Sequence, residues 1–95
     1  MVFVWDENKN AANRRKHGVS FETAARAFDD PLAVSYVERV VGDEVRWHTV
    51  GLVGAVTMFL VAHLVKDEDN GDEEIRIISA RKANRSERAL YEDAH

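Results

Sequence analysis

Positive charge is concentrated near the end of the sequence, in residues 76–88. These thirteen residues contain four arginines and one lysine, and they are opposed by Glu87. A guanidinium group stays charged at any physiological pH and binds phosphate through two parallel hydrogen bonds. The segment therefore predicts a site for phosphate or a similar anion. The cations are Arg76, Arg81, Lys82, Arg85 and Arg88.

Arg81 stands at the end of a predicted β-strand, IRIISAR, in residues 75–81. Strict alternation would place Arg81 on the same face as Ile75 and Ile77. Arg76 would then lie on the other face. Because the isoleucines would anchor the strand in the core, Arg81 would project from a rigid support where burial ends.

Lys66 ends the preceding apolar segment, and the acidic turn DEDNGDEE, residues 67–74, joins it to this strand. In an antiparallel hairpin, Lys66 would lie near Glu74 and Arg76 rather than near Arg81. We therefore expect these cations to line an edge of the sheet instead of converging on one point.

Other groups with possible chemistry are scattered. The four histidines, at positions 17, 48, 63 and 95, show no paired ligand spacing, and the phosphate-loop, dinucleotide and HExxH motifs do not occur. We expect no metal and no cofactor. His63, in an apolar strand, indicates a hydrogen-bonded core histidine. Tyr91 could be buried by the last helix, or its hydroxyl could reach a site.

The elements that would position these residues follow the order β-α-α-β-β-β-β-α. Residues 2–6 predict a short edge strand. A basic helix would begin at an Asn8 cap and end at Gly18, where His17 complements the helix dipole. A second helix would begin at Ser20 and stop before Pro31, with Phe21, Ala24, Ala25 and Phe28 on its apolar face.

From residue 33 onward the apolar period becomes that of strands. Turn signals at 42–43, at 54 and at 70–71 separate four strands that predict a largely antiparallel meander. The last helix would begin at Asn84 with Glu87 three residues on, which is capping-box spacing, and Leu90 would pack inward. The pattern predicts an α+β fold with two N-terminal helices and a C-terminal helix.

Length and composition limit the class of protein. Ninety-five residues suit a single domain spanning 1–95, and the absence of cysteine excludes a disulfide scaffold or a thiolate metal site. The first ten residues do not have the pattern of a signal peptide, so we expect none, and the longest apolar run, residues 52–65, falls short of a membrane span. We expect a soluble cytoplasmic protein without a membrane partner. The net charge of −4 arises from DEDNGDEE, which holds six of the seventeen acidic residues.

Two segments resemble the BrnT family of toxins. WDENKNAANRRKHGVSFETAARAFDDP, residues 5–31, resembles the opening of these proteins, with its WD, KHG and Ser-Phe elements. IRIISARKANRSERALYE, residues 75–92, resembles their closing segment. The resemblance implies a RelE-like fold and a ribonuclease toxin of a type II toxin–antitoxin pair. It also implies a BrnA-type ribbon-helix-helix antitoxin, through which the assembly would reach operator DNA.

The resemblance also gives the cations an expected role in metal-independent cleavage of an RNA substrate. Arg81 would stabilise the phosphate during attack by the 2′-hydroxyl, with Lys66 and Arg76 assisting. The RNA backbone would be positioned by Lys16, His17, Arg85 and Arg88. The general acid stays open between His17, His63 and Tyr91. The alternatives are a non-catalytic module that binds nucleic acid or a protein partner, and an inactivated toxin retained for interaction.

Overall fold

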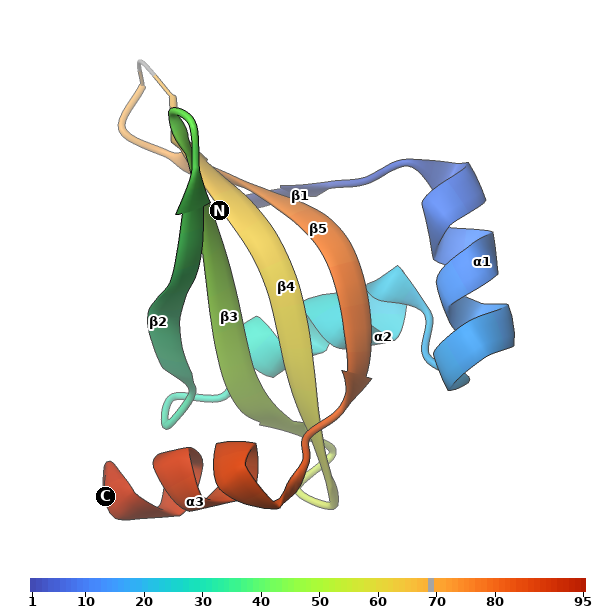
Figure 1. Cartoon of the computed structure of the whole chain (residues 1–95), viewed down its shortest axis with the longest axis vertical. Helices are drawn as coiled ribbons and strands as arrows, with labels where there is room; N and C mark the ends of the chain where they lie inside the picture. Colours follow the sequence, from blue (N-terminus) through green and yellow to red (C-terminus); the bar gives the residue numbers. More distant parts are fainter. Residues whose placement is uncertain (69) are drawn as a thin grey trace.

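A five-stranded sheet forms the centre of the protein in a computed structural model that describes residues 1–68 and 70–95 (Figure 1). Its strand order is β1-β5-β4-β3-β2, with β1 parallel to β5 and every other pair antiparallel. The strands are β1 (Val2–Val4), β2 (Val34–Val41), β3 (Glu44–Val53), β4 (Thr57–Asp67) and β5 (Glu73–Lys82). The predicted α+β fold with a largely antiparallel sheet is therefore confirmed. Asp69, within the predicted acidic turn, lies outside the described residues.

The helices cover the two faces of the sheet unequally. They are α1 (Glu7–His17), α2 (Phe21–Ala25), the 3-10 helix η1 (Arg26–Asp29) and α3 (Arg85–Asp93). In Figure 1, α1 lies beside β5, α2 lies behind the sheet, and α3 crosses the end of the sheet where the chain leaves β5. No helix among the residues described is long and apolar enough to cross a membrane.

Alternate residues of β4 pack against different helices, which defines two faces. Phe59 and Val61 belong to the larger core, which contains Phe21 of α2 and Ala27 of η1. The neighbouring residue Leu60 packs with Tyr91 of α3. We call these the α2 face and the α3 face. The predicted apolar side of the second helix is confirmed, because Phe21 and Ala24 are fully buried.

The first helix begins two residues before its predicted start. Its N-cap is Asp6, not Asn8, and the Asp6 carboxylate accepts hydrogen bonds from the backbone N–H groups of Asn8 and Lys9. A carboxylate is also favoured at the positive end of the helix dipole. The predicted end is correct, since Gly18 adopts the left-handed conformation with φ of 73°.

α1 continues the edge of the sheet after β1 has ended. β1 pairs with β5 only at residues 74–76. Beyond that point the Asn13 side chain accepts a hydrogen bond from the Ala80 N–H at 3.1 Å and donates one to the Ala80 carbonyl at 2.9 Å. These bonds satisfy backbone groups of β5 that no strand pairs.

An irregularity in β5 changes the face on which Arg81 lies. The register with β4 shifts at this point, so that His63 is opposite Ile77 whereas the preceding residue Ala62 is opposite Ser79. The extra residue lets Ile77 and Ala80 both point to the core of the α2 face. Arg81, opposite Leu60, therefore lies on the α3 face. The prediction that Arg81 shares a face with the isoleucines is wrong.

The C-terminal helix begins as predicted but buries different residues. The capping box between Asn84 and Glu87 is present in both directions. Leu90 was expected to pack inward, yet it is 48% exposed, and Tyr91 is buried instead. The Tyr91 hydroxyl donates a hydrogen bond of 2.7 Å to Asp30 across the face of the sheet.

Candidate active site

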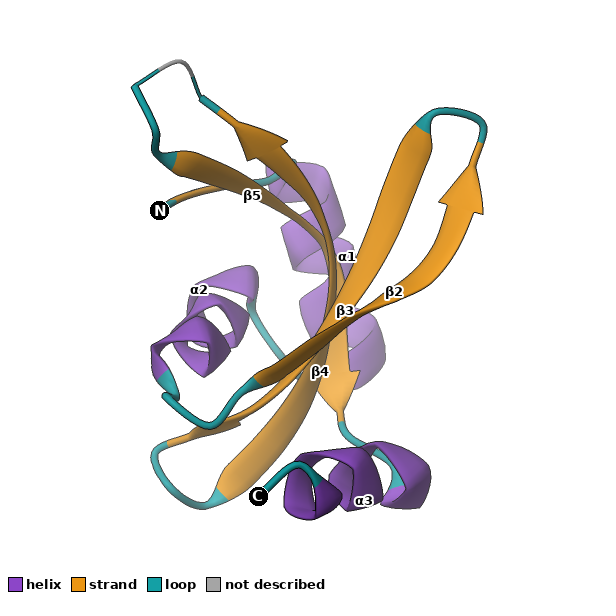
Figure 2. Ribbon diagram, turned by 90° about the vertical axis from the view of Figure 1, so that its left-hand side faces the viewer, coloured by secondary structure: helices purple, strands orange, loops and turns teal. Residues whose placement is uncertain are grey.

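The α3 face is covered by α3 at one end and open toward the two hairpin tips. Val50, Met58 and Leu60 lie beneath the helix. Above it the β2–β3 and β4–β5 hairpins diverge, as Figure 2 shows. The open half carries cationic side chains from each of these four strands. We call its polar side chains the cationic face: Tyr36, Arg39, Arg46, His48, Lys66, Arg76 and Arg81.

Arg81 is held in place by Glu87. Its Nη1 and Nη2 atoms donate to the two carboxylate oxygens of Glu87, each at 2.8 Å, and Nη1 also donates to the Lys82 carbonyl at 3.2 Å. Glu87 is buried and also accepts from the Asn84 N–H at 2.8 Å. The bonds to Arg81 hold the pKa of Glu87 below its usual value and raise the pKa of Arg81. Both groups are therefore charged in the folded protein near neutral pH.

A tyrosine and a histidine lie on the neighbouring strands of this face. Tyr36 of β2 is directly opposite His48 of β3, and its hydroxyl lies 3.2 Å from His48 Nδ1. The two rings meet edge to face, with centroids 5.4 Å apart. Burial lowers the pKa of His48, and burial together with the charge of Glu87 raises the pKa of Tyr36.

His48 and two arginines border a hollow of about 290 Å³ on this face. Arg39 and Arg46 are directly opposite each other on β2 and β3, an arrangement that costs free energy unless the charges are compensated. Each arginine is partly neutralised by a nearby glutamate, Arg39 by Glu38 at 3.0 Å and Arg46 by Glu44 at 3.2 Å. The buried Nε of Arg46 has no hydrogen-bond partner among the residues described. The complete lining is Glu38, Arg39, Arg46, His48, Ala62, Ile78 and Ser79.

Lys66 and Arg76 form a separate group nearer the hairpin tips. Lys66 is directly opposite Glu74, as expected, and Arg76 is two residues further along β5. They border a hollow of about 560 Å³ between the two hairpins. Arg76 and Arg81 are separated by five steps along the strand, which is at most roughly 16 Å. The lining is Val41, Asp43, Glu44, Val45, Leu64, Val65, Lys66, Glu74 and Arg76.

The three cations expected to act together therefore share a face without meeting at one point. The expectation that they follow an edge of the sheet is wrong for Lys66 and Arg76, because β4 is an interior strand and β1 covers β5 at residues 74–76, whereas Arg81 lies on the part of β5 that β1 does not pair. The irregularity in β5 is the reason that Arg76 and Arg81 lie on the same face.

The four residues expected to position RNA fall into two pairs. Arg85 and Arg88 are exposed on α3, next to the Arg81 end of the face. Lys16 and His17 are exposed in the last turn of α1. This helix lies beside β5, on the side away from β4 (Figure 1). The structure thus places the α3 pair beside the cationic face and the α1 pair on another part of the surface.

His63 is a core histidine, as predicted. It lies on the α2 face, 2% exposed, and its Nε2 is 2.7 Å from the Thr49 hydroxyl. Burial lowers its pKa to about 4. Tyr91 is likewise engaged in the structure, because its hydrogen bond to Asp30, reinforced by burial, raises its pKa to about 12.

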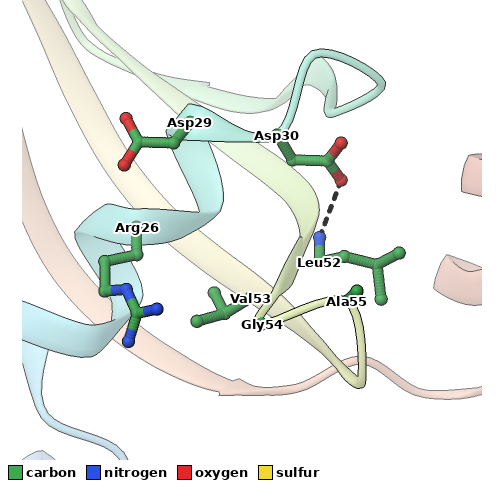
Figure 3. A pocket seen from close by; sticks show the side chains of 7 residues that line it. All are labelled: Arg26, Asp29, Asp30, Leu52, Val53, Gly54 and Ala55. Carbon is green, nitrogen blue, oxygen red and sulfur yellow. Dashed lines mark hydrogen bonds between the residues drawn. The ribbon is translucent and has the colours of Figure 1, made fainter.

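The Asp30 carboxylate forms hydrogen bonds with the turn before β2, with β3 and with α3, beside a shallow pocket of about 320 Å³ (Figure 3). This carboxylate accepts from the Leu32 N–H, the Leu52 N–H and the Tyr91 hydroxyl. Burial opposes its ionisation, but these bonds keep the pKa of Asp30 below the usual value. The pocket lies away from the cationic face, and the carboxylate within it serves the packing of α3.

Tyr36, Arg39, Arg46 and His48 were not identified from the sequence. Their positions in the two strands would place them on one face only once the register of the β2–β3 hairpin is known. That register contains a shift between Val37 and Arg39. The available signal was the spacing of Arg46 and His48 on one strand, two residues apart and so on the same side. No group of three histidine, aspartate or glutamate side chains in residues 1–68 and 70–95 is arranged to hold a metal ion.

Comparison with known proteins gives the class of this chain. A family described as "Ribonuclease toxin, BrnT, of type II toxin-antitoxin system" matches residues 5–87. A similar fold occurs in the 1.1 Å crystal structure of the Brucella abortus ribonuclease toxin BrnT, with a TM-score of 0.61 and 23% sequence identity. That match covers 90% of this chain and 100% of the Brucella chain. Comparison with curated protein sequences gave no match.

The chain is therefore one of the ribonuclease toxins of type II toxin–antitoxin systems. Within that class it belongs to the BrnT family, which confirms the resemblance stated from residues 5–31 and 75–92. Membership of such a system implies an antitoxin partner.

Proposed function

We propose that the protein cleaves RNA without a metal ion and that Arg81 stabilises the phosphate under attack. The observation that carries this proposal is the geometry of the Arg81 side chain. The two terminal nitrogens, Nη1 and Nη2, form an end-on pair that donates to the Glu87 carboxylate. The guanidinium has five N–H groups. The N–H group of Nε and one of the two N–H groups of Nη2 make no hydrogen bond with any described residue. This side-on pair can bind two phosphate oxygens while Glu87 keeps the guanidinium in place.

Fixed positive charge suits this reaction. The 2′-oxygen attacks the adjacent phosphorus, and negative charge grows on the phosphate oxygens before the bond to the 5′-oxygen breaks. A guanidinium that is already oriented stabilises that charge without reorganisation in the transition state. Arg81 is 37% exposed, so a phosphate can reach it without movement of the sheet.

The other cations would hold the rest of the RNA. Lys66 and Arg76 lie too far along the face to touch the same phosphate as Arg81, so their assistance consists of binding a neighbouring nucleotide. Arg85 and Arg88 would bind the backbone on the α3 side. Lys16 and His17 would contact a longer substrate that passes around β5. We expect this activity in the cytoplasm, where RNA and the translation apparatus are found.

The partner that neutralises this activity is a BrnA-type antitoxin in our proposal. Its ribbon-helix-helix region would bind operator DNA, and the toxin would reach DNA only through it. The edge strand β2 offers the antitoxin unpaired backbone groups along Val34–Val41. Val37 and Val40 are 46% and 60% exposed on that strand. An extended apolar segment can add to such an edge as a further strand.

Val40→Lys tests this docking edge, because an edge lysine opposes strand addition. We expect at least about tenfold weaker antitoxin binding in titration calorimetry, or about 1.4 kcal/mol, with RNA cleavage unchanged. Val56→Lys is the matched control, since Val56 is 82% exposed in the turn at the other end of the sheet. Equal antitoxin affinity of Val40→Lys and the wild type would place the antitoxin elsewhere.

A non-catalytic binding module is the second candidate, and the paired arginines Arg39 and Arg46 favour it, since they bind an anion without a need for cleavage. Incubation of the purified protein with RNA in EDTA separates the candidates. Cleavage that Arg81→Ala abolishes supports the nuclease. Retention of intact RNA supports the module, and neither cleavage nor retention would indicate an inactivated toxin.

A further inference from the structure

We propose that His48 is the general base of the reaction, the group that accepts the proton of the attacking 2′-hydroxyl, and that Tyr36 positions its ring. This inference rests on the proposed cleavage of RNA. His48 lies on β3 between Tyr36 of β2 and Ala62 of β4, so strands on both sides fix its backbone. It borders the same open hollow as the paired arginines.

The Tyr36 hydroxyl contacts one ring nitrogen of His48 and leaves the other available to the substrate in our proposal. It lies 3.2 Å from Nδ1, and the other ring nitrogen, Nε2, makes no hydrogen bond with residues 1–68 or 70–95. When the tyrosine oxygen accepts Nδ1–H, the lone pair of the neutral imidazole is on Nε2. Tyr36 then serves His48 as an orienting acceptor, in the way that a carboxylate orients other catalytic histidines.

His48 also lies beside the groups that would hold the phosphate. β4 lies between the two residues: His48 is opposite Ala62, and Arg81 is opposite Leu60 two residues further along β4. Two strand spacings and two residues of rise separate their backbones by roughly 12 Å, a gap that the long arginine side chain and a bound nucleotide can bridge. The charges of Arg81 and Glu87 both act on His48. A phosphate on the side-on pair of Arg81 would thus bring its ribose toward the hollow that His48 borders.

The charged and titratable groups around His48 come from every element packed against it. They are Glu38 and Arg39 of β2, Arg46 of β3, His63 of β4, Arg81 of β5 and Glu87 of α3, together with the hydroxyl of Tyr36. Burial lowers the pKa of His48, while the acidic and basic neighbours act in opposite directions. The ring is therefore neutral near pH 7 and able to accept a proton.

The reaction balances with water as the only further reactant. The 2′-O–H proton moves to Nε2 of His48 as the 2′-oxygen bonds to phosphorus. The bond from phosphorus to the 5′-oxygen then breaks, and the leaving oxygen takes a proton from water. Loss of the Nε2 proton to solvent regenerates neutral His48. The products are a 2′,3′-cyclic phosphate and a free 5′-hydroxyl.

The three groups considered from the sequence as the general acid are placed less well than His48 to act as this base. His63 is buried on the opposite face, and the Tyr91 hydroxyl is engaged by Asp30. His17 lies on α1, on the far side of β5. Among the histidines of residues 1–68 and 70–95, His48 is the one that belongs to the cationic face.

His48→Gln and Tyr36→Phe test the inference in single-turnover cleavage of RNA, with RNA affinity measured separately. For His48→Gln we expect a rate at least about 100-fold lower with affinity within about threefold of the wild type. The wild-type rate should rise with pH as His48 loses its proton, and His48→Gln should lack that rise. Tyr36→Phe should cleave about tenfold more slowly, because the oxygen that orients the His48 ring is removed. The pH at which its cleavage rate rises should also shift. His95→Gln, at the exposed C-terminus, should match the wild type.

A folded His48→Gln protein with the wild-type rate and pH profile would overturn the inference and leave the nuclease intact. If His48→Gln lost cleavage rate and RNA affinity to the same extent, His48 would be a residue that contacts RNA and not a base. That result would also overturn the inference. Wild-type protein that leaves RNA uncut would overturn the proposed function together with the base. Detection of the 2′,3′-cyclic phosphate end on the wild-type product is expected, and a 3′-hydroxyl end would contradict the step.

Discussion

Glu87 has three simultaneous roles, which explains why an acidic residue lies within the basic segment. It receives the end-on pair of Arg81, it closes the capping box with Asn84, and its carboxylate acts on His48. The ion pair leaves Arg81 oriented and still able to bind a second acceptor. An arginine without such a partner would lose side-chain entropy on binding each phosphate.

His63 makes the stability of the protein depend on pH. Its pKa is about 4 in the folded state and about 6.5 when unfolded. The unfolded chain therefore binds the proton more readily, so the free energy of unfolding falls as pH decreases through this window. One pKa unit corresponds to about 1.4 kcal/mol, so the loss from His63 approaches about 3 kcal/mol near pH 4.

Urea unfolding of the wild type and His63→Gln at several pH values measures this effect. We expect the wild type to lose stability more steeply than the variant as pH falls from about 6.5 to about 4. His95→Gln should follow the wild-type slope, because its ring is exposed. Parallel curves for the wild type and His63→Gln would contradict the buried neutral histidine.

Close packing between η1 and β3 depends on a glycine. A methyl group at Gly51 would lie 2.5 Å from the Ala27 carbonyl oxygen, a backbone atom that cannot move independently. Gly51→Ala should therefore destabilise the fold by about 1 to 3 kcal/mol through overpacking. Thermal unfolding by circular dichroism measures this loss. Gly51→Ala with wild-type stability would mean that η1 shifts away from the sheet without cost.

Local signals at the ends of elements predicted much of the fold. Gly18, Ser20 and the Asn84–Glu87 box are positions where a short stretch of sequence satisfies backbone groups, and all three end or begin helices as predicted. The extra residue in β5 has no such signal. It arises because Ile77 and Ala80 both fit the core beneath the helices, which is a tertiary effect.

The candidate site was only partly predictable for the same reason. Arg81 could be located because a strand end is visible in the sequence. The face of the sheet on which Arg81 lies could not be predicted, since one extra residue in the strand reverses the direction of the side chain. Tyr36 and His48 are twelve residues apart in the sequence, and their pairing depends on the register of the β2–β3 hairpin.

The charge of the whole molecule is divided between its regions. The net charge of −4 includes six acidic residues in 67–74, the segment of sequence between the two basic residues Lys66 and Arg76, whereas the cationic face occupies one side of the sheet. Blocks of opposite charge on one surface allow RNA binding by a protein that is acidic overall.

Salt dependence of RNA affinity tests this division. Each phosphate neutralised on a single strand contributes about 0.7 to the slope of log affinity against log salt. Lys66→Ala should reduce the magnitude of that slope by about this amount if Lys66 binds one phosphate. Arg26→Ala, on η1 against the α2 face, should leave the slope unchanged. An unchanged slope for Lys66→Ala would remove that end of the face from the RNA path.

Cleavage of RNA in EDTA by the wild type, Arg81→Ala and Arg26→Ala decides whether Arg81 stabilises the phosphate under attack. We predict that the wild type and Arg26→Ala cleave equally well. Arg81→Ala should fold, shown by an unchanged circular dichroism spectrum, and cleave at least about 100-fold more slowly. A folded Arg81→Ala protein that cleaves RNA at the wild-type rate would show that Arg81 does not stabilise the phosphate.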